Sequence, residues 1–162
     1  MVTQGREHLF REIVDGEMIP NEVGRMILKW WNDLPNKFQD VVLGEFVVMP
    51  NHFHGIVIIE VYVGADLRVS PEDEKKGGHI GPPQRKSDLP LSRMIQWFKT
   101  MTTNEYIRGV RGLNWKPFDE KMWQRNYYEH VIRDEKDLQP KTDYIFVNPS
   151  RWDEDEENDQ NR

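Results

Sequence analysis

The sequence predicts an α+β fold, with an antiparallel sheet of the ferredoxin-like kind and helices packed on one face of it. Two observations support this class. Apolar residues recur at strand spacing in some segments and at helix spacing in others, and the predicted helices are interspersed among strands joined by short turns. A chain of 162 residues can bury the core of one domain. We therefore expect a single domain over residues 1–152, with a flexible loop at 62–90 and a disordered acidic tail at 153–162.

The first half of the chain contains a hairpin, a helix and two strands. Asp15-Gly16, between two short apolar stretches, indicates a β-hairpin. Asn21 can cap a helix that runs to about Leu34 with an apolar face at helical spacing. Residues 41–50 (VVLGEFVVMP) and 52–63 (HFHGIVIIEVYV) are rich in Val, Ile and Phe, so we expect two antiparallel strands there.

The second half is expected to form a helix, a strand and a final helix. Ser92, or a residue just before it, begins the first of these helices, and Gly109 and Gly112 end it. Residues 121–133 (KMWQRNYYEHVIR) have the aromatic and β-branched content of a strand. The last helix runs from about Asp134 to Val147, because Asn148-Pro149 stops it.

Composition and charge limit the class of protein. There is no cysteine, so disulfides and thiolate metal sites are excluded. No apolar run approaches the ~20 residues of a membrane helix and no signal-peptide pattern is present, so we expect a cytoplasmic protein. Six of the acids that make the net charge −6 lie in residues 153–162. Residues 85–133 carry ten Lys/Arg against five Asp/Glu, which permits a nucleic-acid partner.

The stretch MPNHFHGIV (49–57) places two histidines on either side of a phenylalanine at the start of a predicted strand. Because side chains alternate along a strand, His52 and His54 point to one face and Phe53 to the other. If the helices cover the Phe53 face, the imidazoles lie on the open face and could share a divalent ion with a third ligand. Two half-exposed imidazoles without a metal are the plain alternative.

Tyr144 and Asn148 are four residues apart on the last predicted helix, so they lie on one face about one turn apart. A phenol with a pKa near ~10 is a poor nucleophile at neutral pH without a cation. An amide oxygen is a hard ligand that suits Mg²⁺ or Mn²⁺. Two imidazoles, an amide and a tyrosine could thus form a phosphoryl-transfer site. Alternatively, Tyr144 packs as a core aromatic and Asn148 caps the helix end.

Four motifs occur in order along the chain: QGREHLF (4–10), FVVMPNHFHGIVII (46–59), WQRNYYEHVIRDE (123–135) and YIFVNPSRW (144–152). Together they resemble the IS200-like transposases with a single catalytic tyrosine, and more closely the REP-associated group of the HUH endonuclease superfamily. The resemblance covers residues 4–152 apart from the loop. It implies that residues 1–152 form a HUH-type transposase domain, an antiparallel sheet with helices behind it.

The resemblance also implies roles for individual residues. His52, Phe53 and His54 match the histidine–hydrophobic–histidine motif, Tyr144 matches the nucleophile, and Asn148 matches the third metal ligand. Such enzymes use Mg²⁺ or Mn²⁺ to cut single-stranded DNA, forming a 5′-phosphotyrosine bond and freeing a 3′-hydroxyl. The expected partner is therefore single-stranded or hairpin DNA, and the protein could act as a monomer or a homodimer.

Contacts to DNA are expected from the basic, aromatic second half of the chain. Stacking on exposed bases could come from Trp97, Trp115, Trp123, Tyr127 and Tyr128, although core packing is the alternative for each. Phosphate contacts could come from seven basic residues, namely Arg93, Lys99, Arg108, Arg111, Lys116, Arg125 and Arg133.

Two features depart from the family pattern. Relatives have a full strand before QGREHLF, beside the strand with the histidines, whereas this sequence supplies only Met1, Val2 and Thr3. Pro140 lies where relatives have helix formers, and because proline is harmless only near a helix start, the helix with Tyr144 is expected to begin around Pro140.

Two alternatives to a transposase follow. The first is a truncated or decayed relic that binds DNA hairpins without catalysis. The second is a metal hydrolase that uses His52, His54 and His130 with an activated water.

Overall fold

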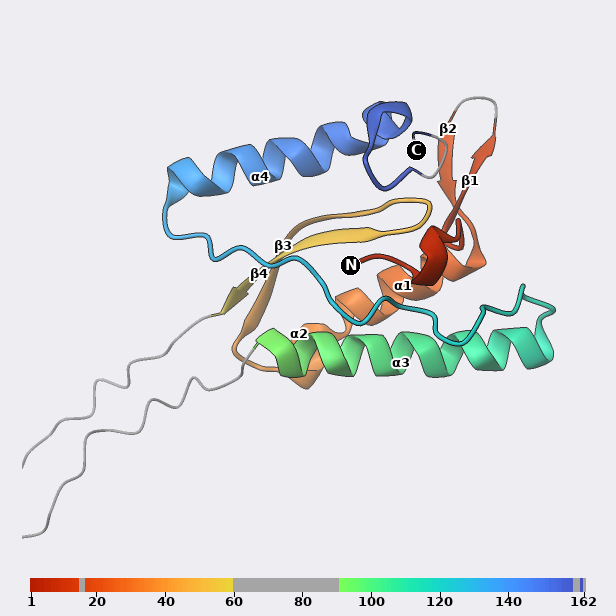
Figure 1. The fold of residues 1–162 in the computed structure, drawn as a ribbon. Coiled ribbons are helices and arrows are strands. Elements are labelled where there is room, and N and C mark those ends of the chain that lie inside the picture. Colours follow the sequence, from red (N-terminus) through yellow and green to blue (C-terminus); the bar gives the residue numbers. More distant parts are fainter. Residues whose placement is uncertain (15–16, 60–90, 159–160, 162) are drawn as a thin grey trace, which may run out of the picture.

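The computed structural model describes residues 1–14, 17–59, 91–158 and 161 (Figure 1). The predicted Asp15-Gly16 turn, the last residues (60–63) of the strand predicted at 52–63 and the predicted loop at 62–90 lie outside these residues. Within the described parts, helices pack against antiparallel strands, so the α+β class is confirmed. The elements are η1 (Gln4–Arg6), β1 (Arg11–Val14), β2 (Glu17–Pro20), α1 (Glu22–Asn32), α2 (Leu34–Lys37), β3 (Val41–Val48), β4 (Phe53–Ile59), α3 (Leu91–Gly112), α4 (Glu135–Val147) and η2 (Asn148–Glu154).

The α1 helix begins and ends close to the predicted positions. The Asn21 side chain accepts a hydrogen bond from the Gly24 backbone N–H, which satisfies one of the free donors at the helix start. The apolar face of α1 is buried through Val23, Met26, Ile27 and Trp31. The chain does not leave helical structure at Pro35, which instead lies in the first turn of the short α2 helix, where its missing N–H costs nothing.

The β3 and β4 strands pair antiparallel, as predicted, with Val48 opposite Phe53 and Val47 opposite His54. One face of this pair packs on α1 and α3, because the Phe53 ring lies 4.7 Å from the Trp31 ring and 5.8 Å from the Phe98 ring. Gly55 lies on the same face. A Cβ there would approach the Trp31 ring to 2.6 Å, so no larger residue fits without a shift of this packing.

The opposite face of β3 and β4 is covered as well, which corrects the expectation of helices on one face only. Ile145 of α4 and Trp152 of η2 are buried with Val47, Met49 and Ile56. The α4 helix therefore lies on the far side of the strands from α1 and α3 (Figure 1). The apolar character of Val47 and Ile56 explains this, since the face that carries the histidines is not polar enough to remain open to water.

Met1, Val2 and Thr3 lie where the resemblance places a central strand. Val2 forms an antiparallel bridge with His52, and Thr3 forms one with Trp123. The Met1 amino group donates to the Phe53 carbonyl at 2.7 Å. Instead of one continuous ferredoxin-like sheet, the described residues form two separate two-stranded sheets and these two isolated bridges.

The predicted strand at 121–133 is wrong. Only Trp123 makes a bridge, and the rest of the segment has no regular structure. A strand needs a neighbour for its backbone groups, and within 121–133 only Met122, Trp123 and Gln124 pair with the N-terminal residues. Two backbone carbonyls of this segment find a donor in a side chain instead: the Lys99 ammonium donates to the carbonyls of Gln124 at 2.7 Å and Arg125 at 3.3 Å.

The α4 helix begins at Glu135 rather than near Pro140, so that expectation is also wrong. The Asp134 side chain caps it by accepting from the Asp137 backbone N–H at 2.9 Å. Pro140 is exposed inside the helix. Its missing hydrogen bond lies on the outer side of α4, where water can satisfy the free carbonyl.

The acidic C-terminal segment does not form the disordered tail that the sequence predicts in the part that the structure describes, residues 153–158 and 161. Glu157 pairs with Arg6 at 2.6 Å, and its carbonyl accepts from the Asn51 side chain at 2.7 Å. Asn158 is buried and donates to the Trp152 carbonyl at 3.0 Å. These contacts attach an acidic stretch to the body, beside the histidines.

Candidate metal and nucleophile site

Two distant parts of the chain, residues 52–54 and 144–152, meet on the covered face of β4. His52 and His54 have ring centroids 4.8 Å apart, and the Tyr144 ring of α4 lies edge-on to His54 at 5.2 Å. The Trp152 ring lies 6.0 Å from His52. The predicted alternation along the strand explains the paired histidines, and the buried Ile145 holds α4 in a position where Tyr144 faces them.

Asn148 follows Tyr144 by one helical turn and lies at the C-terminal end of α4. Its backbone N–H donates to the Tyr144 carbonyl, so the residue does occupy the cap position. Its side chain is buried, with 3% exposed, while Tyr144 is 47% exposed. Burial raises the pKa of the Tyr144 phenol, the Asp155 carboxylate raises it further, and the Asn148 amide opposes both.

The hydrogen bonds of Asn51 determine the protonation of His52. The Asn51 amide nitrogen donates to the carbonyls of Arg6 at 3.1 Å and Glu157 at 2.7 Å. Its oxygen therefore faces His52 Nδ1, 2.8 Å away, and can only accept. Nδ1 must carry the hydrogen, which leaves a lone pair on Nε2 when the ring is neutral.

Both imidazoles are held in the neutral form. Burial lowers the pKa of His52 to about 2, with further contributions from His54 and the chain's amino terminus. Burial and the same amino terminus lower the pKa of His54 to about 4. A neutral imidazole with a free nitrogen is the form that binds a metal.

The two imidazoles of this cluster fit a divalent cation, and the Asn148 amide fits it when its oxygen, not its nitrogen, faces them. His52 Nε2, His54 Nε2 and Asn148 Nδ2 are buried and have no hydrogen-bond partner. Buried polar atoms are normally paired, so three such atoms at neighbouring side chains indicate a missing partner. A half-turn of the Asn148 amide would present its oxygen. Across the described residues, however, no three His, Asp or Glu side chains form a closed metal cluster, so ligands would have to move together on binding.

The basic residues predicted to contact phosphates are spread over the molecule. Lys99 is committed to backbone carbonyls, burial lowers its pKa, and Lys116 pairs with Glu7 at 3.1 Å. The other five are exposed, and three of them are on α3, which packs on the Phe53 face away from the histidines. These five are Arg93, Arg108, Arg111, Arg125 and Arg133.

The predicted stacking aromatics divide into packed and exposed groups. Trp123 is buried and donates to the Thr102 hydroxyl at 3.0 Å, and Trp97 packs edge-on against Trp30. Trp115 donates to Glu22 at 2.8 Å. Tyr128 is 85% exposed and so could meet a base, whereas Tyr127 lies under the Lys99 ammonium.

His130 does not join the cluster. Its Nε2 lies 2.8 Å from both carboxylate oxygens of Asp137 in the first turn of α4, and this contact lowers the pKa of Asp137. The pair ties the irregular segment before α4 to the helix. The hydrolase alternative with His130 as a ligand therefore loses its third imidazole.

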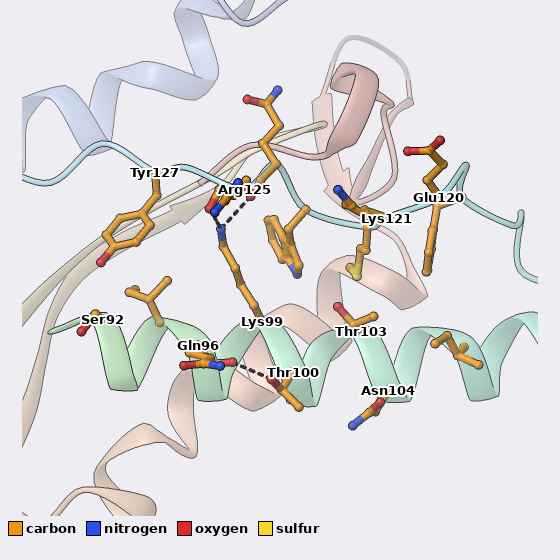
Figure 2. Close-up of a pocket in the computed structure, with 16 residues that line it drawn as sticks. Ser92, Gln96, Lys99, Thr100, Thr103, Asn104, Glu120, Lys121, Arg125 and Tyr127 are labelled. Carbon is orange, nitrogen blue, oxygen red and sulfur yellow. Dashed lines mark hydrogen bonds between the residues drawn. The ribbon is translucent and has the colours of Figure 1, made fainter. Parts of the chain in front are cut away.

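A separate open hollow of about 590 Å³ lies between α3 and residues 118–127 (Figure 2). Gln96, Thr100, Thr103 and Asn104 line it from the helix side. None of the histidine-cluster residues lines it. It is therefore distinct from the candidate metal and nucleophile site.

Three further residues belong to the site and were not predicted from the sequence: Asn51, Trp152 and Asp155. Asp155 Oδ2 lies 3.8 Å from His52 Nε2. Asn51, next to His52, could have been found from its position before the histidine motif. Nothing local marks Asp155, which the sequence places in an acidic run.

The fold and the site define a class: an α+β protein that gathers two neutral histidines, a tyrosine and an asparagine on one covered face of a strand pair. No family model matches the chain, and no solved structure matches it. A Haemophilus influenzae protein described as uncharacterized is 34% identical over 154 residues, which is 94% of this chain and 79% of that protein. The chain belongs to the same family as that protein.

A second Haemophilus influenzae protein shares a shorter region with the chain. It is named "Putative REP-associated tyrosine transposase" and is 40% identical over 58 residues, 34% of this chain and 33% of that protein. The similarity to a transposase is thus partial and spans about a third of each chain. No helix in the described residues is both long enough and apolar enough to cross a membrane.

Proposed function

We propose that this protein is a single-stranded DNA transposase or endonuclease with Tyr144 as its nucleophile. The observation that carries the proposal is the meeting of His52, His54, Tyr144 and Asn148 from β4, α4 and the start of η2, with unpaired donor atoms on three of them. The partial similarity to a protein named as a tyrosine transposase supports the same function.

His52, His54 and Asn148 would hold Mg²⁺ or Mn²⁺, since two imidazole nitrogens and an amide oxygen suit these ions. When bound, the ion would withdraw charge from the scissile phosphate and favour attack by an oxygen nucleophile. The protein's own contribution is to keep both imidazoles neutral by burial and to fix the His52 ring through Asn51.

The proposed step exchanges one phosphodiester for another. The Tyr144 hydroxyl oxygen attacks the phosphorus, the bond from phosphorus to the 3′-oxygen breaks, and the 5′-side phosphate becomes attached to Tyr144. The phenol proton is lost to solvent, and the departing 3′-oxygen takes up a proton. Because bonds of the same kind are broken and made, a 3′-hydroxyl can reverse the step without an energy source.

Tyr144 suits this role because its ring is half-exposed at the edge of the cluster. A raised phenol pKa means that the hydroxyl is protonated at neutral pH, so activity would depend on the cation. The expected partner is single-stranded or hairpin DNA. Of the proposed phosphate contacts, the exposed Arg125 and Arg133 are the nearest to Tyr144 in the sequence, on the segment that leads to α4.

The test is formation of a covalent protein–DNA adduct, resolved on a denaturing gel, with a labelled hairpin oligonucleotide and Mg²⁺ or Mn²⁺. Wild type should form the adduct, and EDTA should prevent it. Tyr144→Phe should abolish it. Tyr128→Phe is the matched control, because it removes an exposed phenol hydroxyl but keeps the ring that could stack on a base, and it should retain the adduct. An undiminished adduct with Tyr144→Phe would remove this residue from the role.

A non-catalytic relic that binds DNA hairpins is the second candidate, favoured because no three His, Asp or Glu side chains in the described residues form a closed metal cluster. Such a protein would bind a hairpin in the presence of EDTA and after His52→Ala. It would form no adduct at any metal concentration. A hydrolase would instead release cut DNA without covalent protein, and Tyr144→Phe would leave its rate unchanged.

A further inference from the structure

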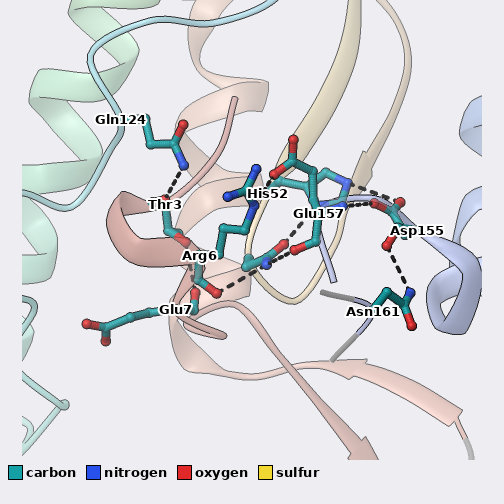
Figure 3. Close-up of polar contacts among 9 residues, drawn as sticks. Thr3, Arg6, Glu7, His52, Gln124, Asp155, Glu157 and Asn161 are labelled. Carbon is teal, nitrogen blue, oxygen red and sulfur yellow. Dashed lines mark hydrogen bonds and ion pairs between the residues drawn. The ribbon is translucent and has the colours of Figure 1, made fainter. Parts of the chain in front are cut away.

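Among the described residues of the C-terminal segment, Asp155 is an acidic residue whose buried side chain faces His52 (Figure 3). Its side chain is 5% exposed. One carboxylate oxygen, Oδ1, accepts from the Glu157 backbone N–H at 2.7 Å. Its carbonyl accepts from the Asn161 side chain at 3.0 Å and from the Asn158 N–H at 3.1 Å. The residue is therefore held in one position by its own segment.

That segment is attached to the body close to the histidines. Glu157 pairs with Arg6 at 2.6 Å, and the Asn51 amide donates to the Glu157 carbonyl. The same Asn51 amide orients His52. The position of Asp155 and the orientation of His52 are thus set by one shared residue.

The second carboxylate oxygen faces an atom that cannot donate to it. Asp155 Oδ2 lies 3.8 Å from His52 Nε2, beyond hydrogen-bonding distance. The Asn51 contact places the His52 hydrogen on Nδ1, so Nε2 offers a lone pair. A buried carboxylate thus faces a buried acceptor, and no Lys or Arg in the described part of the chain pairs with it. This arrangement is unfavourable unless a metal ion or a proton lies between the two atoms, and burial raises the pKa of the Asp155 carboxyl.

The spacing also suits a shared ion. In an octahedral site, ligand atoms about 2.1 Å from Mg²⁺ or Mn²⁺ lie either about 3.0 Å apart, when adjacent, or about 4.2 Å apart, when opposite. The separation of 3.8 Å is within about 0.4 Å of the opposite arrangement, so a small shift of either side chain would allow both atoms to bind one ion.

We propose that Asp155 is a further protein ligand of the metal, on the His52 side of the site; this rests on the metal site of the proposed function. With Asp155 the ligands become two imidazoles, an amide oxygen and one carboxylate, and the carboxylate adds the negative charge that the other three lack. Affinity for hard cations rises with the number of charged ligands. The acidic C-terminal segment is then part of the site, and its attachment through Glu157 positions a ligand.

The experiment measures Mn²⁺ binding to the full chain by isothermal titration calorimetry without DNA. Asp155→Asn keeps the size and the oxygen that accepts from Glu157 N–H, and removes the charge. Glu156→Gln is the matched control, because it removes one charge from an exposed neighbouring position. We expect Asp155→Asn to weaken Mn²⁺ binding about ten-fold or more, and Glu156→Gln to change it by less than about two-fold.

Thermal unfolding in EDTA accompanies the titration. Asp155→Asn should unfold at the same or a higher temperature than wild type, since it removes an uncompensated buried charge. Weaker binding together with a lower unfolding temperature in EDTA would assign the loss to folding and overturn the inference.

The two proposals fail in different ways. If Asp155→Asn binds Mn²⁺ like wild type while His52→Ala abolishes binding, Asp155 is not a ligand and the metal site stands. If wild type itself binds no Mn²⁺, both the metal site and this inference fail. Tyr144→Phe should leave Mn²⁺ binding unchanged while it removes the DNA adduct, which separates ligation from the nucleophile's role.

Discussion

Asn51 is the residue whose removal tests the geometry of the site most directly. It is fully buried, and its side chain makes three hydrogen bonds: to the carbonyls of Arg6 and Glu157, and to His52 Nδ1. These contacts join the N-terminal segment, the histidine motif and the C-terminal segment. We predict that Asn51→Ala loosens all three together.

The expected loss in the free energy of unfolding follows from these three hydrogen bonds. Each contributes about 1 kcal/mol to stability, and a buried partner left unpaired costs somewhat more. The loss in the free energy of unfolding should therefore be about 3 kcal/mol, a large part of the ~5–15 kcal/mol typical of a domain. Asn51→Asp should be at least as damaging, because a carboxylate oxygen would then face two carbonyl oxygens.

Urea unfolding followed by circular dichroism measures this change. Asn36→Ala is the matched control, because the exposed Asn36 makes one side-chain hydrogen bond, to Asp33 at 2.8 Å, and should cost less than about 0.5 kcal/mol. A loss below about 1 kcal/mol for Asn51→Ala would refute the network. The assignment of the His52 hydrogen to Nδ1 would then lose its basis.

Two further predictions concern the strand that carries the histidines. Phe53→Ala should lower the free energy of unfolding by about 3–5 kcal/mol, because the Phe53 ring packs on Trp31 and Phe98. Phe146→Ala is the control: Phe146 is 65% exposed, so its loss should change the free energy of unfolding by less than about 0.5 kcal/mol. Equal losses in the two variants would contradict the assigned core. In EDTA, stability should fall as the pH drops from 6.5 towards 4, because the unfolded histidines take up protons there while burial holds the pKa of His52 at about 2 and of His54 at about 4. Urea midpoints should fall less steeply with pH in His54→Gln than in wild type, and identical slopes would exclude His54 as a cause.

Local sequence signals predicted the elements that depend on local physics. The Asn21 cap, the apolar face of α1 and the long α3 helix are confirmed, because capping and helical spacing act within a few residues. The separation of His52 and His54 from Phe53 is confirmed for the same reason, since alternation is a property of the extended chain itself.

The failed expectations all depended on a partner elsewhere in the chain. Residues 121–133 have the composition of a strand, but only Met122, Trp123 and Gln124 pair with the backbone of the N-terminal residues. Pro140 lies inside α4 because the Asp134 cap and the buried Ile145 hold the helix on both sides of it. The acidic C-terminal segment is attached because Arg6 and Asn51 offer partners to Glu157.

The sequence alone thus determined the ligand and nucleophile candidates, the α+β class and the faces of its helices and strands. Only the tertiary structure decided that α4 covers the histidine face, that Tyr144 lies beside His54, and that Asp155 approaches His52. The physical reason is the distance along the chain over which each kind of interaction acts. Capping, spacing and alternation act between neighbours along the chain, whereas the burial of Ile145 and Trp152 against Val47 and Ile56 joins segments about a hundred residues apart, which no local pattern encodes.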